Sequence, residues 1–228
     1  MNVLAIDTAT ATLGLSLKSG SESRTVLLQA GLKHSEKLMP TVRTLLQEAG
    51  LGGEELELIA CSIGPGSFTG IRIGLATAKG LALGIQAGGT SCRLIGVSTL
   101  DGLAHRFRRF EGTVAAVNPS LRKKHYAAVY RTGVLTGDYL ETTLADLAAA
   151  LRRRSQIPML LTGAAASDLY ALLLPEHGAE KLVLDASGQS SDPAGLLECG
   201  VARLEEPPTE PVPLYLRKSE AEITFYGE

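Results

Sequence analysis

The residues with the clearest chemical potential lie at the end of the first predicted strand and in a glycine-rich segment. Asp7 ends the apolar run of residues 2–6 and precedes a polar turn with threonines at 8, 10 and 12. A carboxylate at such a strand end can hold a metal–nucleotide complex through water, or it can cap its own turn. Residues 63–74 read IGPGSFTGIRIG and place the hydroxyls of Ser67 and Thr69 at the start of a predicted helix.

Free backbone N–H groups at a helix start attract anions. Asp7, Ser67 and Thr69 are therefore the candidate cofactor-binding residues. The competing interpretation is a plain strand-to-helix turn in which Ser67 or Thr69 caps the helix.

Other patterns typical of catalysis are missing from the sequence. Residues 63–74 do not form a P-loop, because no lysine follows the last glycine. The histidines form neither HxxxH nor HExxH, and no GxSxG elbow occurs. Cys61, Cys92 and Cys199 are odd in number and far apart, which favours free thiols in a reducing cytoplasm. We predict no catalytic residue and no metal site.

The helix predicted over residues 70–86 carries two rows of small residues. Five of them recur every four positions: Gly66, Gly70, Gly74, Ala78 and Ala82. Gly80 and Gly84 add a second row. Glycine inside a helix lowers helix stability by about 1 kcal/mol relative to alanine. We therefore expect these glycines to permit close packing that offsets this loss. Packing on the chain's own sheet explains one row. The second row predicts another helix on the opposite face, either from this chain or from a partner.

Hydrophobic periodicity supplies the elements that position these residues. Alternating and buried apolar runs predict strands near residues 2–6, 13–17 and 56–63, and helical spacing predicts a helix over 35–49. The second half repeats this order of strand, turn, strand, helix and strand. We therefore predict a duplicated α/β unit with mixed sheets.

The domain boundaries follow from this order of elements. Residues 1–97 with 212–228 form the predicted first lobe, and residues 98–206 form the second, smaller lobe. The Pro-rich residues 205–211 form a stiff linker between them.

Composition and charge limit the function classes. Hydrophobic residues make up 45% of the 228 residues, which is enough for a packed core. A net charge of −2 excludes a strong overall field toward nucleic acid or anionic membrane. We expect no transmembrane helix and no signal peptide. Three basic runs, at residues 106–109, 122–124 and 152–154, could meet RNA phosphates if folding brings them together.

Several motifs resemble those of one bacterial protein family, in order along the chain. They are AIDT at 5–8, HSEKLMP at 34–40, GPGSFTGIRIG at 64–74, GLA at 80–82, GVSTL at 96–100 and PLYLR at 213–217. The chain resembles the TsaB (YeaZ) family, which serves threonylcarbamoyladenosine modification of tRNA. The resemblance implies an α/β, two-lobed actin-like ATPase (ASKHA) fold, each lobe a mixed sheet with helices.

The resemblance also implies a non-catalytic, cytoplasmic scaffold subunit. Its expected partners are a TsaD-like catalytic paralogue, which modifies adenosine 37, and a TsaE-like P-loop ATPase. The tRNA would be bound indirectly through the complex, and the chain alone would form a homodimer. No cofactor is expected to bind tightly to the isolated chain, but ATP or ADP is expected in the complex.

The same resemblance assigns the partner interface to the helices that follow His34 and Gly70. The candidate interface residues are His34, Leu38, Val42, Leu45, Leu46, Gly70, Ile71, Gly74, Leu75, Ala78 and Ala82.

The sequence departs from the family pattern after the first strand of the second half. The family commonly has an Asp, an Arg and a Gly-Glu stretch there, whereas this chain has Asn118, Arg122 and Lys124. The missing carboxylate favours a scaffold. The alternatives are an actin-like ATPase or kinase, a glycoprotease-type peptidase, or a direct tRNA-binding module.

Overall fold

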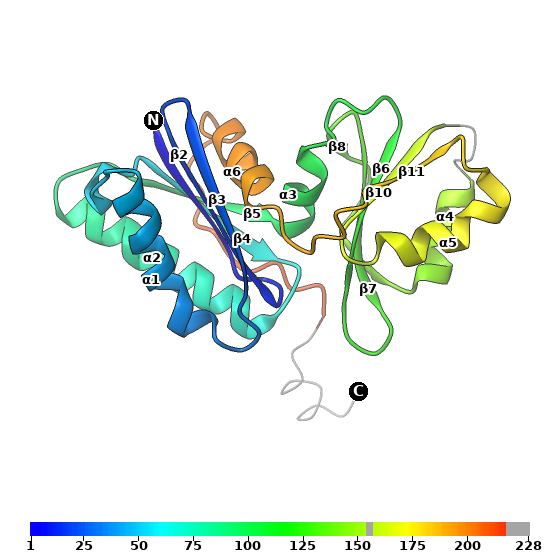
Figure 1. Cartoon of the computed structure of the whole chain (residues 1–228), viewed down its shortest axis with the longest axis horizontal. Helices are drawn as coiled ribbons and strands as arrows, with labels where there is room; N and C mark the ends of the chain where they lie inside the picture. The colour runs from blue at the N-terminus through cyan, green and yellow to red at the C-terminus, as the bar shows by residue number, and fades with distance from the viewer. Residues whose placement is uncertain (154–156, 218–228) are drawn as a thin grey trace.

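The protein forms two lobes that lie side by side, each built on one β-sheet (Figure 1). The computed structural model describes residues 1–153 and 157–217. Residues 218–228, which the sequence assigned to the first lobe, lie outside the described residues.

The first sheet combines an antiparallel hairpin with two parallel strands. Its spatial order is β3 (Glu22–Gln29), β2 (Thr12–Ser19), β1 (Asn2–Asp7), β4 (Leu58–Gly64) and β5 (Arg93–Ser98). Strand β2 is antiparallel to β1 and β3, whereas β1, β4 and β5 are parallel. Helices α1 (His34–Glu48) and α2 (Phe68–Ala87) cover the face away from the second lobe (Figure 1). A short 3₁₀ helix, η1 (Gly53–Glu55), precedes β4.

The second sheet repeats the strand order of the first. It runs β11 (Leu182–Leu184), β10 (Met159–Thr162), β6 (Thr113–Pro119), β7 (His125–Arg131) and β8 (Val134–Leu135), and β9 (Leu140–Thr142) also pairs with β7. Helices α4 (Leu144–Arg152) and α5 (Ala166–His177) cover its outer face (Figure 1). The hairpin β6–β7 corresponds to β1–β2, and β10 and β11 correspond to β4 and β5. This topology confirms the duplicated unit and the two-lobed actin-like fold.

Two helices fill the junction between the sheets. They are α3 (Thr99–His105) and α6 (Pro193–Ala202), which pack on each other (Figure 1). Leu196 and Leu197 of α6 share a core cluster with Val3 and Ala60 of the first sheet. The predicted second lobe of residues 98–206 is therefore wrong at its end, because the apolar face of α6 is buried on the first sheet.

The segment after α6 returns across both lobes. Residues 205–211 contain no helix or strand, as the proline content predicts. The Leu214 N–H donates to the Ile63 carbonyl at 2.7 Å, whereas Leu216 packs into the core of the second lobe. Tyr215 stacks on Phe68 of α2 with ring centroids 4.3 Å apart. We call residues 211–217 the strap, because they contact both lobes.

Helix α2 is a long, apolar helix of 20 residues. By length and composition alone it is long enough and apolar enough to cross a membrane. Seven of its residues are buried, and they include Ile71, Leu75 and Ala78. Packing on the sheet therefore accounts for the apolar character of this face of the helix.

The first glycine row of α2 lies against the turn that follows β1. A Cβ atom on Gly66 would fall on the Ala9 carbonyl, and one on Gly70 would fall on the Thr8 carbonyl. The Thr8 hydroxyl also donates to the Gly70 carbonyl at 2.7 Å. This row therefore serves the chain's own packing, whereas a Cβ on Gly80 or Gly84 would meet no atom within 4 Å.

Two alanine substitutions on this helix should have opposite effects. Gly70→Ala should lower the free energy of unfolding by roughly 1–3 kcal/mol, because the added methyl group displaces the turn after β1. Gly80→Ala should raise it by about 1 kcal/mol, because it improves helix propensity in open space. Denaturant unfolding of both variants measures the difference. Equal effects would contradict the assignment of the two rows.

Candidate partner-binding site

The eleven residues predicted to bind a partner lie in the interior of the first lobe. Leu38, Val42 and Leu45 of α1 are 1% exposed and pack in the same cluster as Leu75 and Ala78 of α2. All eleven are buried: His34, Leu38, Val42, Leu45, Leu46, Gly70, Ile71, Gly74, Leu75, Ala78 and Ala82. Their assignment to a partner surface is wrong, because periodicity identified the face of each helix that packs on the sheet.

The opposite face of α2 is exposed and almost free of charge. The exposed residues of α2 are Thr69, Arg72, Ala76, Gly80, Leu83, Gly84, Gln86 and Ala87. Leu83 is 65% exposed. Arg72 and Lys79 are the charged residues of α2, and they are held by Tyr215 and Glu210. A flat, apolar helix face with two glycines permits the close approach of another helix.

Helix α1 extends this surface. Met39 on its outer side is 38% exposed, and Leu32 just before the helix is fully exposed. Helices α1 and α2 pack beside each other on one face of the sheet (Figure 1). We call the exposed side of these two helices the outer helix face.

Two of the three candidate cofactor residues, Asp7 and Ser67, are engaged in hydrogen bonds within the chain. The two Asp7 carboxylate oxygens accept hydrogen bonds from the Ala9 N–H at 3.0 Å and the Ser191 hydroxyl at 2.5 Å. Ser67 caps α2 by accepting from the Gly70 N–H, and its own N–H donates to Ala9. Thr69 is exposed. The Ser67 contact matches the capping interpretation, and the Asp7 side chain is buried at 1% exposure.

Burial also changes the ionisation of Asp7. Loss of hydration raises the pKa of the Asp7 carboxyl above its usual value, although the hydrogen bonds from Ser191 and Ala9 oppose this shift. A carboxyl group with a raised pKa holds its proton more readily and is a poorer ligand for a metal–nucleotide complex.

The chain's own residues fill the cleft between the lobes at this end. Asn118 of β6 donates to the Ser190 carbonyl at 2.8 Å and accepts from the Ala164 N–H at 3.1 Å. The Ser190 hydroxyl lies 3.2 Å from that of Thr10. Ser190 and Ser191 therefore link the first turn of each lobe. The remaining cavity beside them is about 210 Å³, which is smaller than a typical ligand pocket.

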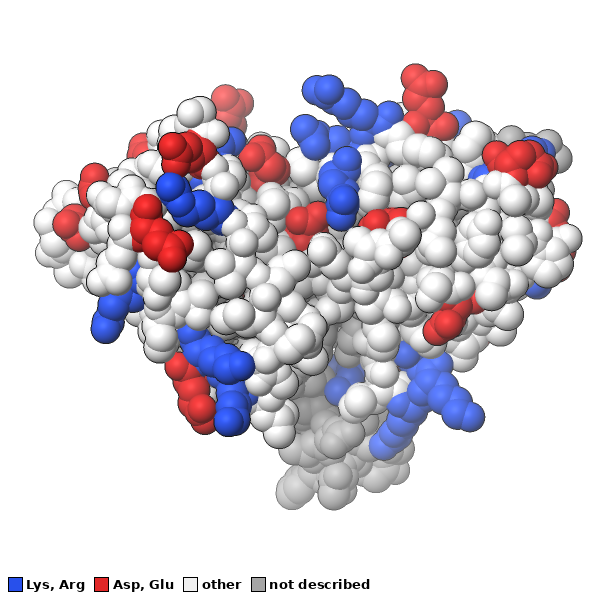
Figure 2. All heavy atoms as spheres, viewed as in Figure 1, with Lys and Arg blue, Asp and Glu red and all other residues white. Residues whose placement is uncertain are grey.

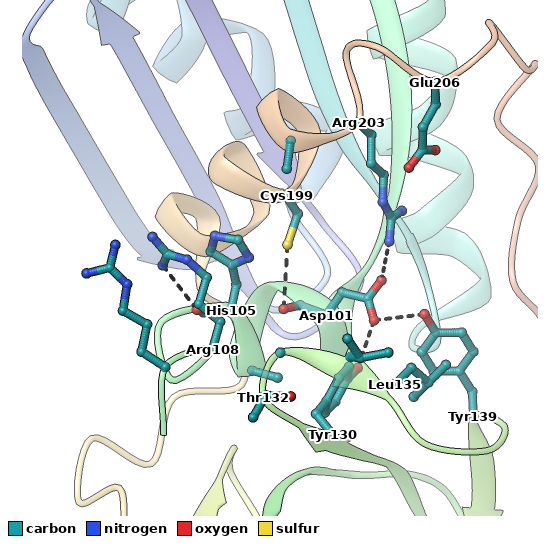
Figure 3. A pocket seen from close by; sticks show the side chains of 15 residues that line it. Asp101, His105, Arg108, Tyr130, Thr132, Leu135, Tyr139, Cys199, Arg203 and Glu206 are labelled. Carbon is teal, nitrogen blue, oxygen red and sulfur yellow. Dashed lines mark hydrogen bonds and ion pairs between the residues drawn. The ribbon is translucent and has the colours of Figure 1, made fainter. Parts of the chain in front are cut away.

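A larger cavity of about 660 Å³ lies at the opposite end of the lobe junction. Figure 3 shows Asp101 of α3 at its centre, with Tyr130 and Tyr139 from the second lobe and Arg203 just after α6. Both tyrosine hydroxyls donate to one carboxylate oxygen at 2.8 Å, and Arg203 donates to the other at 2.7 Å. Burial and the neighbouring carboxylate raise the pKa of Tyr130 and Tyr139, so both remain protonated donors. These three hydrogen bonds to Asp101 connect the second lobe with the helices at the lobe junction.

The described residues include no group of side chains arranged to bind a metal ion. They also do not bring the basic runs at 106–109 and 122–124 into one basic surface. Within residues 1–153 and 157–217, no three His, Cys, Asp or Glu side chains are placed to hold a metal ion. The basic runs at 106–109 and 122–124 lie at opposite ends of β6, roughly 20 Å apart at the usual rise per residue. Arg152 and Arg153 lie at the end of α4. Arg154 lies outside the described residues. Folding therefore keeps the runs at 106–109 and 122–124 apart.

Sequence reasoning missed the residues that close the lobe junction. Asp101 was part of a helical pattern, and Ser190 and Ser191 lay in a polar loop without a motif. Their roles depend on partners between 29 and 184 residues away along the chain.

Comparisons with known proteins decide the family. The family model for TsaD, described as tRNA N6-adenosine threonylcarbamoyltransferase, matches residues 28–225. The TsaB protein of Bacillus subtilis, a tRNA threonylcarbamoyladenosine biosynthesis protein, is 29% identical over 99% of this chain and 98% of its own. The structure of YeaZ from Pseudomonas aeruginosa superposes with a TM-score of 0.72 at 26% identity, covering 94% of this chain and 99% of that one.

The chain belongs to the TsaB (YeaZ) family. The Escherichia coli TsaB protein is similar as well, with 32% identity over 63% of this chain and 62% of its own. The resemblance stated from the motifs is thereby confirmed. The match to the TsaD model shows that this TsaB-family chain is related in sequence to the transferase family.

The ionisation of Asp7 predicts a pH-dependent effect on stability. With a folded-state pKa above the unfolded one, the native state loses stability as pH rises through the folded pKa. Asp7→Asn cannot ionise, so its melting temperature relative to the wild type should increase from pH 4 to pH 8. Thermal unfolding followed by circular dichroism measures this difference.

Asp185→Asn provides a control of opposite sign. Partial burial raises the pKa of Asp185, but hydrogen bonds from Thr162 and Ser187 outweigh it and hold the pKa below its usual value. This variant should be less stable than the wild type at neutral pH, and the difference should shrink as pH falls. The same pH trend in both variants would contradict these assignments.

Proposed function

We propose that this chain is a non-catalytic scaffold subunit for the biosynthesis of threonylcarbamoyladenosine at adenosine 37 of tRNA. In this role it binds a catalytic TsaD-like relative through the outer helix face. The observation that carries the proposal is the exposed, nearly uncharged side of α2, where Gly80 and Gly84 leave open space. Membership of a family whose relatives are named for this biosynthesis supplies the pathway.

The energetics of α2 support a helical partner. Each exposed glycine costs the isolated helix about 1 kcal/mol relative to alanine, and Leu83 exposes apolar surface. A partner helix that packs against Gly80 and Gly84 would bury this surface and compensate the cost. The transferase model matches residues 28–225, which include α1 and α2, so a catalytic relative would carry equivalent helices and could pack on this face by approximate twofold symmetry.

The other components follow from the same proposal. The isolated chain would form a homodimer through the outer helix face, and the catalytic relative would replace one copy. A TsaE-like P-loop ATPase would join the pair, and ATP or ADP would bind in the complex rather than to this chain alone. A role in tRNA modification places the protein in the cytoplasm.

A charge on the outer helix face should prevent assembly without affecting the fold. Leu83→Glu should weaken binding to the TsaD-like relative about 100-fold or more, because the carboxylate would be buried without a partner. Titration calorimetry measures the affinity, and light scattering tests whether the variant alone becomes a monomer.

Ala150→Glu is the matched control, because Ala150 is an exposed residue of α4 on the second lobe. It adds the same charge and should leave assembly unchanged. Normal affinity of the Leu83→Glu variant would refute the proposed interface.

An ATPase or kinase remains the competing function, and nucleotide binding distinguishes it. The closed cleft around Asp7 and Ser191 predicts no heat of binding when the isolated chain is titrated with magnesium ATP. Micromolar binding that is lost in Asp7→Ala would favour the enzyme. A peptidase would instead reveal itself by cleavage of casein by the purified chain.

A further inference from the structure

The hairpin turn between β6 and β7 has an unusual backbone for its sequence. The Lys124 N–H donates to the Leu121 carbonyl at 3.1 Å and closes a two-residue turn. The central residues, Arg122 and Lys123, have φ angles of 55° and 62°. Two consecutive positive φ angles are the geometry of a type I′ turn, which Asn-Gly or Gly-Gly adopts most readily.

Long side chains at these positions oppose the stability of the turn. L-residues other than glycine and asparagine are disfavoured in the left-handed region because Cβ approaches the following carbonyl. The turn between β7 and β8 uses Thr132 and Gly133, with φ angles of 47° and 77°, so it places glycine at one of the two positions. Strain of this kind persists where the side chains serve a purpose other than folding.

The turn is held in place at its base. The Ser120 N–H donates to the Lys124 carbonyl at 2.9 Å, and the Ser120 hydroxyl donates to Glu141 at 2.6 Å. Glu141 also lies 3.8 Å from the ammonium group of Lys124. Among residues 1–153 and 157–217, no acidic side chain pairs with Arg122 or Lys123, and both are exposed. The turn therefore presents two unneutralised cations at a fixed position.

A second group of guanidinium and aromatic side chains lies next to this hairpin. Arg217 of the strap donates to the Tyr126 hydroxyl at 3.2 Å, and Tyr126 lies two residues beyond the turn. The Arg217 guanidinium also lies over the ring of Phe68, which stacks on Tyr215. Tyr215 is 37% exposed. Figure 2 shows basic side chains at the lower tip of the second lobe, where the β6–β7 turn projects in Figure 1.

We propose that the turn at residues 121–124 binds the phosphate backbone of a folded RNA, and that Tyr215 of the strap lies alongside it. This inference rests on the proposed function and identifies the part of this chain that touches the tRNA. The net charge of −2 gives no general attraction to a polyanion, so contact requires a local and pre-arranged set of cations. The exposed ring of Tyr215, beside Arg72 and near Arg217, favours a nucleic acid over an acidic protein surface.

The decisive variant exchanges the turn residues for those that the backbone prefers. Arg122→Asn combined with Lys123→Gly should raise the melting temperature by roughly 3 °C, because the positive φ angles no longer carry strain. In the complex with the catalytic relative, the same variant should bind fluorescent tRNA at least about tenfold more weakly at 0.1 M salt. The slope of log affinity against log salt should fall by about 2, one for each lost phosphate contact.

Two control variants test whether tRNA affinity depends on turn strain alone or on the loss of positive charge at any site. Thr132→Asn relieves strain at the turn at the opposite end of β7 and should leave tRNA affinity unchanged. Arg108→Gln combined with Arg109→Gln removes the same charge at the opposite end of β6 and should change the salt slope by less than one.

The outcomes are distinct. A more stable turn variant with unchanged tRNA affinity would overturn the inference. Unchanged tRNA affinity with weaker binding of the catalytic relative would assign the turn to a protein contact and would also overturn it. If the wild-type complex binds no tRNA, the proposed function itself fails, and this inference fails with it.

Discussion

The close approach of α2 to the turn after β1 is the constraint on which the first lobe depends. Gly66 and Gly70 bring the helix backbone against the carbonyls of Ala9 and Thr8, where no Cβ atom fits. This contact fixes the rotation of α2 about its axis, so that Ile71, Leu75 and Ala78 face the sheet. The remaining side of the helix is then necessarily directed at solvent. The geometry of the outer helix face is thus a consequence of packing on the inner one.

In the lobe junction, polar side chains of both lobes are hydrogen-bonded within the chain. Ser191 satisfies Asp7, and Asn118 holds the carbonyl of Ser190, so polar groups at both strand ends are paired within the chain. At the other end, Asp101 collects donors from both lobes, and the strap adds contacts through Leu214 and Leu216. These hydrogen bonds join the two lobes at both ends of their junction.

Two exposed sites have residue types that their local backbone conformation disfavours. Gly80 and Gly84 weaken an exposed helix without any contact in return, and Arg122 and Lys123 occupy a turn that prefers smaller residues. Buried positions such as Gly70 show no such conflict, because the absence of a side chain is required by the Thr8 carbonyl. Features that oppose stability and have no internal partner are those that an external partner would explain.

The sequence by itself determined the fold class, the order of elements and the family. Hydrophobic periodicity and the positions of glycines are local properties. They predicted the repeated strand order and a helix capped by Ser67 or Thr69, and the structure shows that Ser67 is the cap. Tertiary structure alone decided which face of each helix is free, where α6 packs, and how Asp7 is neutralised. Helical spacing locates an apolar stripe but cannot state whether it meets the chain's own sheet or a partner. That distinction depends on contacts such as Asp7 with Ser191, which join residues 184 positions apart.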